Sequence, residues 1–172
     1  MRERPGPDEF DPFYSGYIER VPDADIRATL RAQGAATAAL LRSERARERA
    51  EHAYAPGKWL LKEVVGHLAD TERILAYRAL RIARGDATPL AGFDENRYVA
   101  GGGFSGRTLD DLTAGLEAVR AATLALLDGL PEDAWTRAGT ANEARVTVRA
   151  LAWIIAGHEL HHRAIVEERY LA

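Results

Sequence analysis

The chain has 172 residues, 47% of them hydrophobic, and a formal net charge of −3 at pH 7. This length suffices for one hydrophobic core and is short for two, so the sequence predicts a single domain over residues 1–172. The absence of cysteine excludes disulfides, thiolate metal ligands and cysteine nucleophiles, and the mixture of acids and bases provides no basic surface for nucleic acid.

Apolar residues recur every three or four positions in four long segments, and no segment shows the sustained alternation of a strand. The sequence therefore predicts an all-α fold. The first helix is expected from Asp23 to Arg42, with Gly34 weakening its middle. The second is expected from Lys58 to Arg84, with Gly85 as its C-terminal stop.

The third helix is predicted from Leu109 to Asp128 with Thr108 as its N-cap, and the fourth from Thr147 to Tyr170. Residues 85–107 connect the second helix to the third and are too long and too rich in glycine and proline for a tight hairpin. A long crossover lets its flanking helices run parallel, which predicts a four-helix bundle in up-down-down-up order. The glycines at 101–103 are interpreted as a flexible part of this loop.

The longest apolar run, residues 150–156, is too short to span a bilayer, and the N-terminal residues lack the apolar stretch of a signal peptide. We therefore expect a cytoplasmic protein without a membrane or nucleic-acid partner.

Three of the five histidines lie in one C-terminal stretch, GHELHHRAIVEERY at 157–170. Because residues i and i+4 share a helix face, His158 and His162 can direct two ring nitrogens at one point, which suits a metal ion. His161 is turned by about 100° from His162 and is expected to lie outside the site. The third ligand must be His52 or His67, and His67 is favoured because it lies beside the apolar stripe of the second helix.

The alternative interpretation is that these are ordinary helix histidines, and for His52 it is the preferred one. For His67, His158 and His162 metal binding is favoured, because the pair on the fourth helix lies against a core without other evident partners. Three imidazoles leave one position of a tetrahedral ion free for water or substrate, as in catalytic sites. Zinc, nickel, iron or manganese could occupy such a site.

Residues 158–162 also satisfy the pattern H-E-x-x-H of zinc proteases. The surrounding sequence disagrees with it, because Ile165 and Glu168 stand where a metzincin requires glycine and histidine. A protease is therefore not favoured.

Other charged residues leave two interpretations open. Asp70 and Glu159 either orient a histidine or move a proton, or are solvated surface charges. A set of four arginines in the second helix is predicted to form a solvated face with ion pairs, the alternative being contact with an anionic substrate: Arg73, Arg78, Arg81 and Arg84. Four residues of the crossover are unranked candidates for the pocket mouth: Phe93, Arg97, Tyr98 and Phe104.

The sequence resembles the DinB/YfiT-like family of metalloenzymes. The resemblance is carried by KWLLKEVVGHLADTERILAYRALRIARGD at 58–86, VTVRALAWIIAGHELHHRAIVEERYL at 146–171, and the segments DPFYSGYIERVPDADI and YAPGKW before them. It implies a four-helix bundle in up-down-down-up order with one divalent ion, zinc or nickel, held by His67, His158 and His162. It also implies use of a low-molecular-weight thiol such as bacillithiol or mycothiol, or hydrolysis, and a homodimer.

The expected function is accordingly that of a metal-dependent enzyme acting on a small molecule, either a thiol-dependent S-transferase or a hydrolase, with catalytic residues undetermined. The alternative is a non-catalytic, metal-binding stress-response dimer in which the ion only ties the second helix to the fourth. Solvent access to the ion distinguishes the two.

Overall fold

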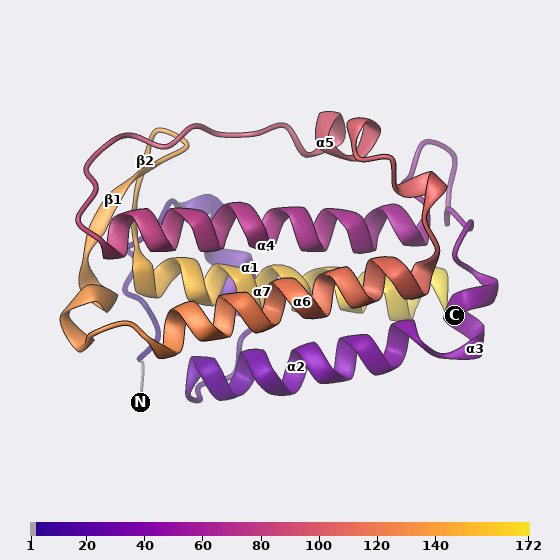
Figure 1. The fold of residues 1–172 in the computed structure, drawn as a ribbon, viewed down its shortest axis with the longest axis horizontal. Coiled ribbons are helices and arrows are strands. Elements are labelled where there is room, and N and C mark those ends of the chain that lie inside the picture. The colour runs from indigo at the N-terminus through magenta and orange to yellow at the C-terminus, as the bar shows by residue number, and fades with distance from the viewer. Residues whose placement is uncertain (1–2) are drawn as a thin grey trace.

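A computed structural model describes residues 3–172 and contains a bundle of four long helices (Figure 1). These helices are α2 (Ile26–Leu41), α4 (Leu61–Ala83), α6 (Leu109–Asp128) and α7 (Val148–Ile165). In Figure 1, α2 and α7 run from left to right and α4 and α6 run from right to left, which corresponds to the expected up-down-down-up order. The two helices that flank the long crossover are thus parallel.

Side-chain caps fix where three of the long helices begin. Asp25 accepts hydrogen bonds from the amides of the first turn of α2, so this helix begins three residues later than Asp23, the predicted start. Thr108 caps α6, as predicted, and both predicted ends of this helix are confirmed. Thr147 caps α7 by accepting from the amide of Ala150.

The second long helix, α4, ends at the predicted glycine. Gly85 has a φ of 79°, and its amide donates to the carbonyl of Ile82 while the amide of Asp86 donates to that of Arg81. This pair of bonds is a Schellman motif, which requires a left-handed residue and therefore favours glycine.

Short helical segments fill connections that were expected to be irregular. They are η1 (Pro12–Tyr14), α1 (Ser15–Ile18), α3 (Glu44–Glu48), α5 (Glu95–Gly101), η2 (Phe104–Gly106), η3 (Glu132–Thr136) and the π-helical turn η4 (Val166–Tyr170). The interpretation of the crossover glycines as flexible loop was wrong, because Gly101 ends α5 and Gly102 packs so closely on Phe104 that a Cβ there would lie 2.4 Å from its ring.

The chain also forms a β-hairpin, which the expectation of an all-α chain did not include. Strands β1 (Ala138–Ala141) and β2 (Ala144–Thr147) pair antiparallel around a turn at Asn142 and Glu143, both with positive φ. Four-residue strands are too short to display an alternating pattern. The crossover joins this hairpin through Leu90, whose amide donates to the carbonyl of Thr140 over 2.9 Å.

The buried apolar residues form two clusters, one at each end of the bundle. Between them lies a layer of buried polar side chains contributed by all four long helices: Gln33, Glu72, Arg120 and Glu159. The histidines considered below lie near this level on α4 and α7. None of the described helices is both long and apolar enough to cross a bilayer.

Candidate metal centre

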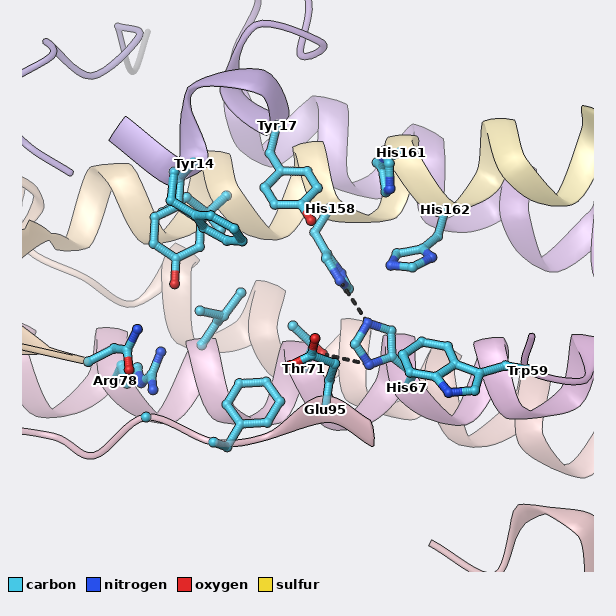
Figure 2. A pocket seen from close by; sticks show the side chains of 16 residues that line it. Tyr14, Tyr17, Trp59, His67, Thr71, Arg78, Glu95, His158, His161 and His162 are labelled. Carbon is cyan, nitrogen blue, oxygen red and sulfur yellow. Dashed lines mark hydrogen bonds between the residues drawn. The ribbon is translucent and has the colours of Figure 1, made fainter. Parts of the chain in front are cut away.

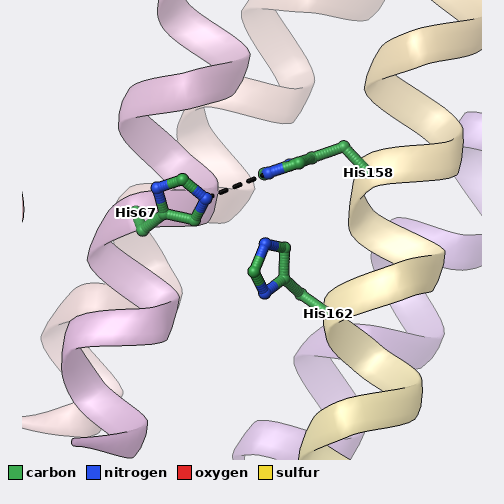
Figure 3. A group of neighbouring side chains, drawn as sticks. All are labelled: His67, His158 and His162. Carbon is green, nitrogen blue, oxygen red and sulfur yellow. Dashed lines mark hydrogen bonds between the residues drawn. The ribbon is translucent and has the colours of Figure 1, made fainter. Parts of the chain in front are cut away.

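The three predicted ligands meet between α4 and α7 (Figure 3). His158 and His162 project from successive turns of α7 toward His67 on α4. One ring nitrogen of each lies within 4.8 Å of the others, and the Nε2 atoms of His67 and His158 are 3.0 Å apart. The structure thus brings together the three residues chosen from the sequence.

The geometry and chemistry of this cluster fit a divalent ion. Tetrahedral zinc with bonds of 2.0–2.1 Å places its ligand nitrogens about 3.3 Å apart, close to the distance between His67 and His158. Within residues 3–172, no hydrogen bond ends on the ring of His162, which is partly buried and lines the pocket described below. A ring nitrogen of this residue is therefore available to coordinate an ion.

All three rings are held in their neutral form, the form that coordinates metals. Burial lowers the pKa of His67 to about 4 and, with the neighbouring histidines, that of His162 to about 3. Burial also lowers the pKa of His158 well below its usual value, and the other histidines add to this. At neutral pH a lone pair on each ring is therefore available.

The metal-free protein is expected to lose stability as the pH falls. The unfolded histidines bind protons below about pH 6.5, whereas the folded ones do so only near pH 4 and 3, so the free energy of unfolding rises with pH in this window. Each histidine contributes up to about 1.4 kcal/mol per pH unit. Urea denaturation between pH 4 and 7 measures how the free energy of unfolding changes with pH. Carboxylates that titrate in the same range contribute equally in wild type and in His162→Asn, so the difference between the two slopes gives the contribution of His162. An unchanged slope in that variant would contradict the assignment.

The histidines form the floor of a pocket of about 310 Å³. Figure 2 shows Trp59 beside His67, Tyr17 above His158, and Arg78 at the other end. The pocket is lined by Phe13, Tyr14, Tyr17, Trp59, His67, Thr71, Leu75, Arg78, Gly92, Phe93, Glu95, Asn142, Ile154, His158, His161 and His162. The side of the cluster that faces this pocket is therefore accessible to a small molecule.

Two side chains, Thr71 and Tyr17, lie next to rings of the cluster. The Thr71 hydroxyl lies 3.4 Å from Nδ1 of His67, which leaves Nε2 facing the other histidines. Tyr17 lies edge-on to His158, with ring centroids 5.6 Å apart, and its partial burial raises the pKa of its hydroxyl. The hydroxyl is thus a neutral hydrogen-bond donor at physiological pH.

The remaining histidines lie outside the cluster, as predicted. His161 lines the pocket, and its ring centroid lies 5.3 Å from that of Tyr17, but it does not belong to the cluster of His67, His158 and His162. His52 lies against Tyr170 instead.

Neither acid proposed as a partner of the histidines contacts them. Asp70 pairs with Arg73 at the surface, as the solvated alternative predicted. Glu159 was expected either beside a ligand or in solvent, and both interpretations were wrong: it is buried in the polar layer, 2.7 Å from Arg120.

The arginines of α4 divide between the two predicted interpretations. Arg73 and Arg81 form ion pairs with Asp70 and Asp86, and Arg84 is exposed. The prediction of a solvated face was wrong for Arg78, which is 3% exposed and lines the pocket.

The crossover contributes to the pocket through residues only partly anticipated. Of the four candidates, Phe93 lines the pocket, whereas Arg97, Tyr98 and Phe104 do not. Glu95 and Asn142 were missed, because only the folded crossover and hairpin bring them to the mouth. Tyr14 and Tyr17 were missed because η1 and α1 are too short to give a helical pattern.

The position of Tyr17 depends on a close approach of α1 to α7. A Cβ at Gly157 would lie 2.1 Å from the Tyr17 carbonyl oxygen, so Gly157→Ala is expected to displace α1 and to lower the free energy of unfolding by about 1–3 kcal/mol. Urea denaturation measures the effect. The control is Gly16→Ala on α1 itself, where a Cβ meets no atom within 4 Å. Equal effects of the two substitutions would refute the packing argument.

A sequence model of the DinB superfamily matches residues 29–166. The fold is similar to that of YfiT from Bacillus subtilis, described as a probable metal-dependent hydrolase with an unusual four-helix bundle topology. The TM-score is 0.70 at 17% identity, covering 96% of this chain and 91% of that one. It is also similar to a mycothiol-dependent maleylpyruvate isomerase, with a TM-score of 0.68 at 20% identity, covering 86% of this chain. The match spans only 61% of that enzyme's chain. No curated protein sequence matches.

Proposed function

Because the chain belongs to the DinB superfamily, we propose that it is a metal-dependent enzyme acting on a small molecule, with one divalent ion held by His67, His158 and His162. The single observation that carries this proposal is the convergence of three neutral imidazoles on the floor of an open pocket. Three protein ligands leave a position for water or substrate, as is typical of catalytic sites and not of structural ones. Zinc and nickel are the preferred ions.

When bound, a divalent ion at this position would lower the pKa of a thiol or water and so supply a nucleophile at neutral pH. The residues of the chain would orient the reaction around it. Thr71 holds the His67 ring through Nδ1, and the Tyr17 hydroxyl can donate to an oxygen or nitrogen of the substrate that gains negative charge. The aromatic walls exclude water from the reacting atoms.

The nucleophile is proposed to be a low-molecular-weight thiol or water. Water is the second candidate. It is supported by the position of Glu95, which lines the pocket and could accept a proton from the attacking water. A thiol coordinated as thiolate needs no such base. Replacement of Glu95 by glutamine should therefore slow a hydrolase strongly and a thiol transferase little.

The proposal is tested with protein stripped of metal by a chelator and reloaded with zinc, nickel or manganese. Each form is assayed with monochlorobimane plus bacillithiol or mycothiol, and with p-nitrophenyl esters in the absence of thiol. Turnover that requires both the metal and His162 is the expected result, with His161→Ala as the matched control. If no metal supports either reaction above the His162→Ala background, the catalytic proposal fails.

The non-catalytic alternative predicts a different outcome from the same samples. If the ion only ties α4 to α7, its removal will lower the melting temperature without changing any reaction rate. A homodimer and a cytoplasmic location remain predictions. Tyr77 and Leu80 are exposed apolar residues on α4 that could contribute to a dimer contact, and gel filtration of the Leu80→Glu variant tests this.

A further inference from the structure

Arg78 occupies an unusual position for a charged residue. It lies eleven residues after His67 on α4, three helical turns and about 16 Å along the axis, so both side chains project from the same face. It is 3% exposed, and it lines the end of the pocket opposite Trp59 (Figure 2). The pocket therefore has the histidine cluster at one end and a fixed positive charge at the other.

Within the part of the chain that the structure describes, the charge of Arg78 has no acidic partner. Among residues 3–172, no carboxylate lies within 4.0 Å of its guanidinium, and the only hydrogen bond it donates runs from Nη2 to the carbonyl of Ala91 over 2.6 Å. The other buried arginine of the bundle, Arg120, binds two carboxylates. A buried guanidinium without a counterion is costly, so an anion is expected to complete this environment.

The remaining donors of Arg78 face an environment suited to a carboxylate. A guanidinium has five N–H groups, and the bond to Ala91 uses one of the two on Nη2. The second Nη2 hydrogen still forms a parallel pair of donors with the N–H of Nε or of Nη1, so one edge of the guanidinium can bind a carboxylate through two hydrogen bonds. The side-chain amide of Asn142 lines the same pocket and offers a further donor. The guanidinium carbon of Arg78 lies over the ring of Phe93, 6.0 Å from the ring centroid, which is the outer limit of a cation–π contact.

The walls between the two ends are largely apolar or aromatic, and they include Tyr14, Leu75 and Ile154. A ligand that reaches from Arg78 to the histidines must therefore carry its charge at one end only. The volume of about 310 Å³ limits it to a small molecule.

We propose that Arg78 is the carboxylate-binding residue of this pocket, and that the substrate is a small monocarboxylate with an apolar body whose far end reaches the histidine cluster. The inference rests on the proposed function in so far as the pocket holds a substrate. It goes beyond that function by naming the substrate's charge and polarity. The carboxylate lies several bonds from the reacting atom and serves to orient the substrate, which makes Arg78 a specificity-determining residue.

The test uses 4-phenylbutanoate as a probe and its neutral analogue 4-phenylbutanamide, which differs only in the charged group. Binding to metal-free protein is measured by isothermal titration calorimetry, because a bound ion would itself attract a carboxylate. Wild type should bind the acid at least tenfold more tightly than the amide. Arg78→Met should remove this preference, whereas Arg73→Met, an exposed arginine of the same helix, should retain it.

Equal affinities of wild type for acid and amide, or binding of neither, would overturn the inference, as would a preference that survives in a folded Arg78→Met. If that variant does not fold, a crystal structure of wild type with 4-phenylbutanoate decides, since its carboxylate must lie within hydrogen-bonding distance of Arg78. Metal content is measured on the same protein after reloading. Failure to bind metal with an intact preference for the acid would reject the proposed function alone, and metal-dependent turnover without that preference would reject this inference alone.

Discussion

Replacement of His67, His158 or His162 by alanine is expected to abolish tight binding of a divalent ion, while His161→Ala should retain about one equivalent, because three ligands leave no redundancy in a tetrahedral site. The loss of affinity should exceed the roughly 10–100-fold that results from removing outer-sphere partners of metal ligands. His161 is the matched control because it lies in the same pocket, one residue from His162, yet outside the cluster. Metal content is measured by mass spectrometry on protein freed of any histidine tag.

Two outcomes would contradict this prediction. A wild type that cannot be loaded with zinc, nickel or manganese would reduce the cluster to buried polar residues, and loss of metal in His161→Ala would mean that the site is assembled differently. Circular dichroism on each variant separates loss of a ligand from loss of the fold. Truncation of a buried ring also leaves a cavity that costs about 2–5 kcal/mol, so the comparison requires temperatures well below each melting point.

The histidine cluster was predictable because its information is local in each helix. The i, i+4 spacing places His158 and His162 on one face, and the apolar stripe of α4 places His67 on the face that packs inward. Only the pairing of α4 with α7 had to be assumed, and few other histidines were available. The four long helices were predictable for the same reason, since each carries a sustained apolar period.

The residues around the cluster were less predictable, because their roles depend on partners distant in sequence. Glu159 lies four residues after the buried Ile155, a spacing that places it on the inward face of α7. It was nevertheless predicted either beside a metal ligand or in solvent, because its partner Arg120 lies 39 positions away and could not be identified from the sequence. Arg78 could have been found from its eleven-residue spacing to His67, which returns to the same helix face after three turns. Asn142 gave no signal, since its place depends on a hairpin of four-residue strands.

Arg120→Met is expected to lower the free energy of unfolding by about 3–5 kcal/mol, because it leaves buried carboxylates without their counterion. Arg120 binds Glu72 through two hydrogen bonds of 2.7 and 2.8 Å, and Glu159 through one of 2.7 Å. It also donates to the carbonyl of Leu30 on α2. Burial alone would lower the pKa of Arg120, but the hydrogen bonds and charges of the two glutamates raise it, so the guanidinium stays charged. One side chain thus links all three neighbouring helices.

Urea denaturation at pH 7 measures the effect, with Arg42→Met as the control for an exposed ion pair. Arg42 binds Glu117 at the surface, where the loss should be at most about 1 kcal/mol. A similarly small loss for Arg120→Met would contradict this prediction, because it would mean that the buried carboxylates become hydrated or protonated at little cost in free energy. Converting Glu72 and Glu159 to glutamine in the Arg120→Met background should recover part of the stability, because the uncompensated charges are removed along with their partner.

The same variants distinguish two roles of the polar layer. Glu159 is adjacent to His158, and its bond to Arg120 joins α7 to α6 at this level, where it would resist rotation or shift of α7 against its neighbours. If the layer sets this register, the triple variant should regain stability but bind zinc more weakly than wild type, since His158 and His162 would no longer be held opposite His67. If the layer contributes only stability, zinc affinity and stability should recover together. Zinc titration of the triple variant therefore determines whether the buried charges position the three histidines that are proposed to bind the metal.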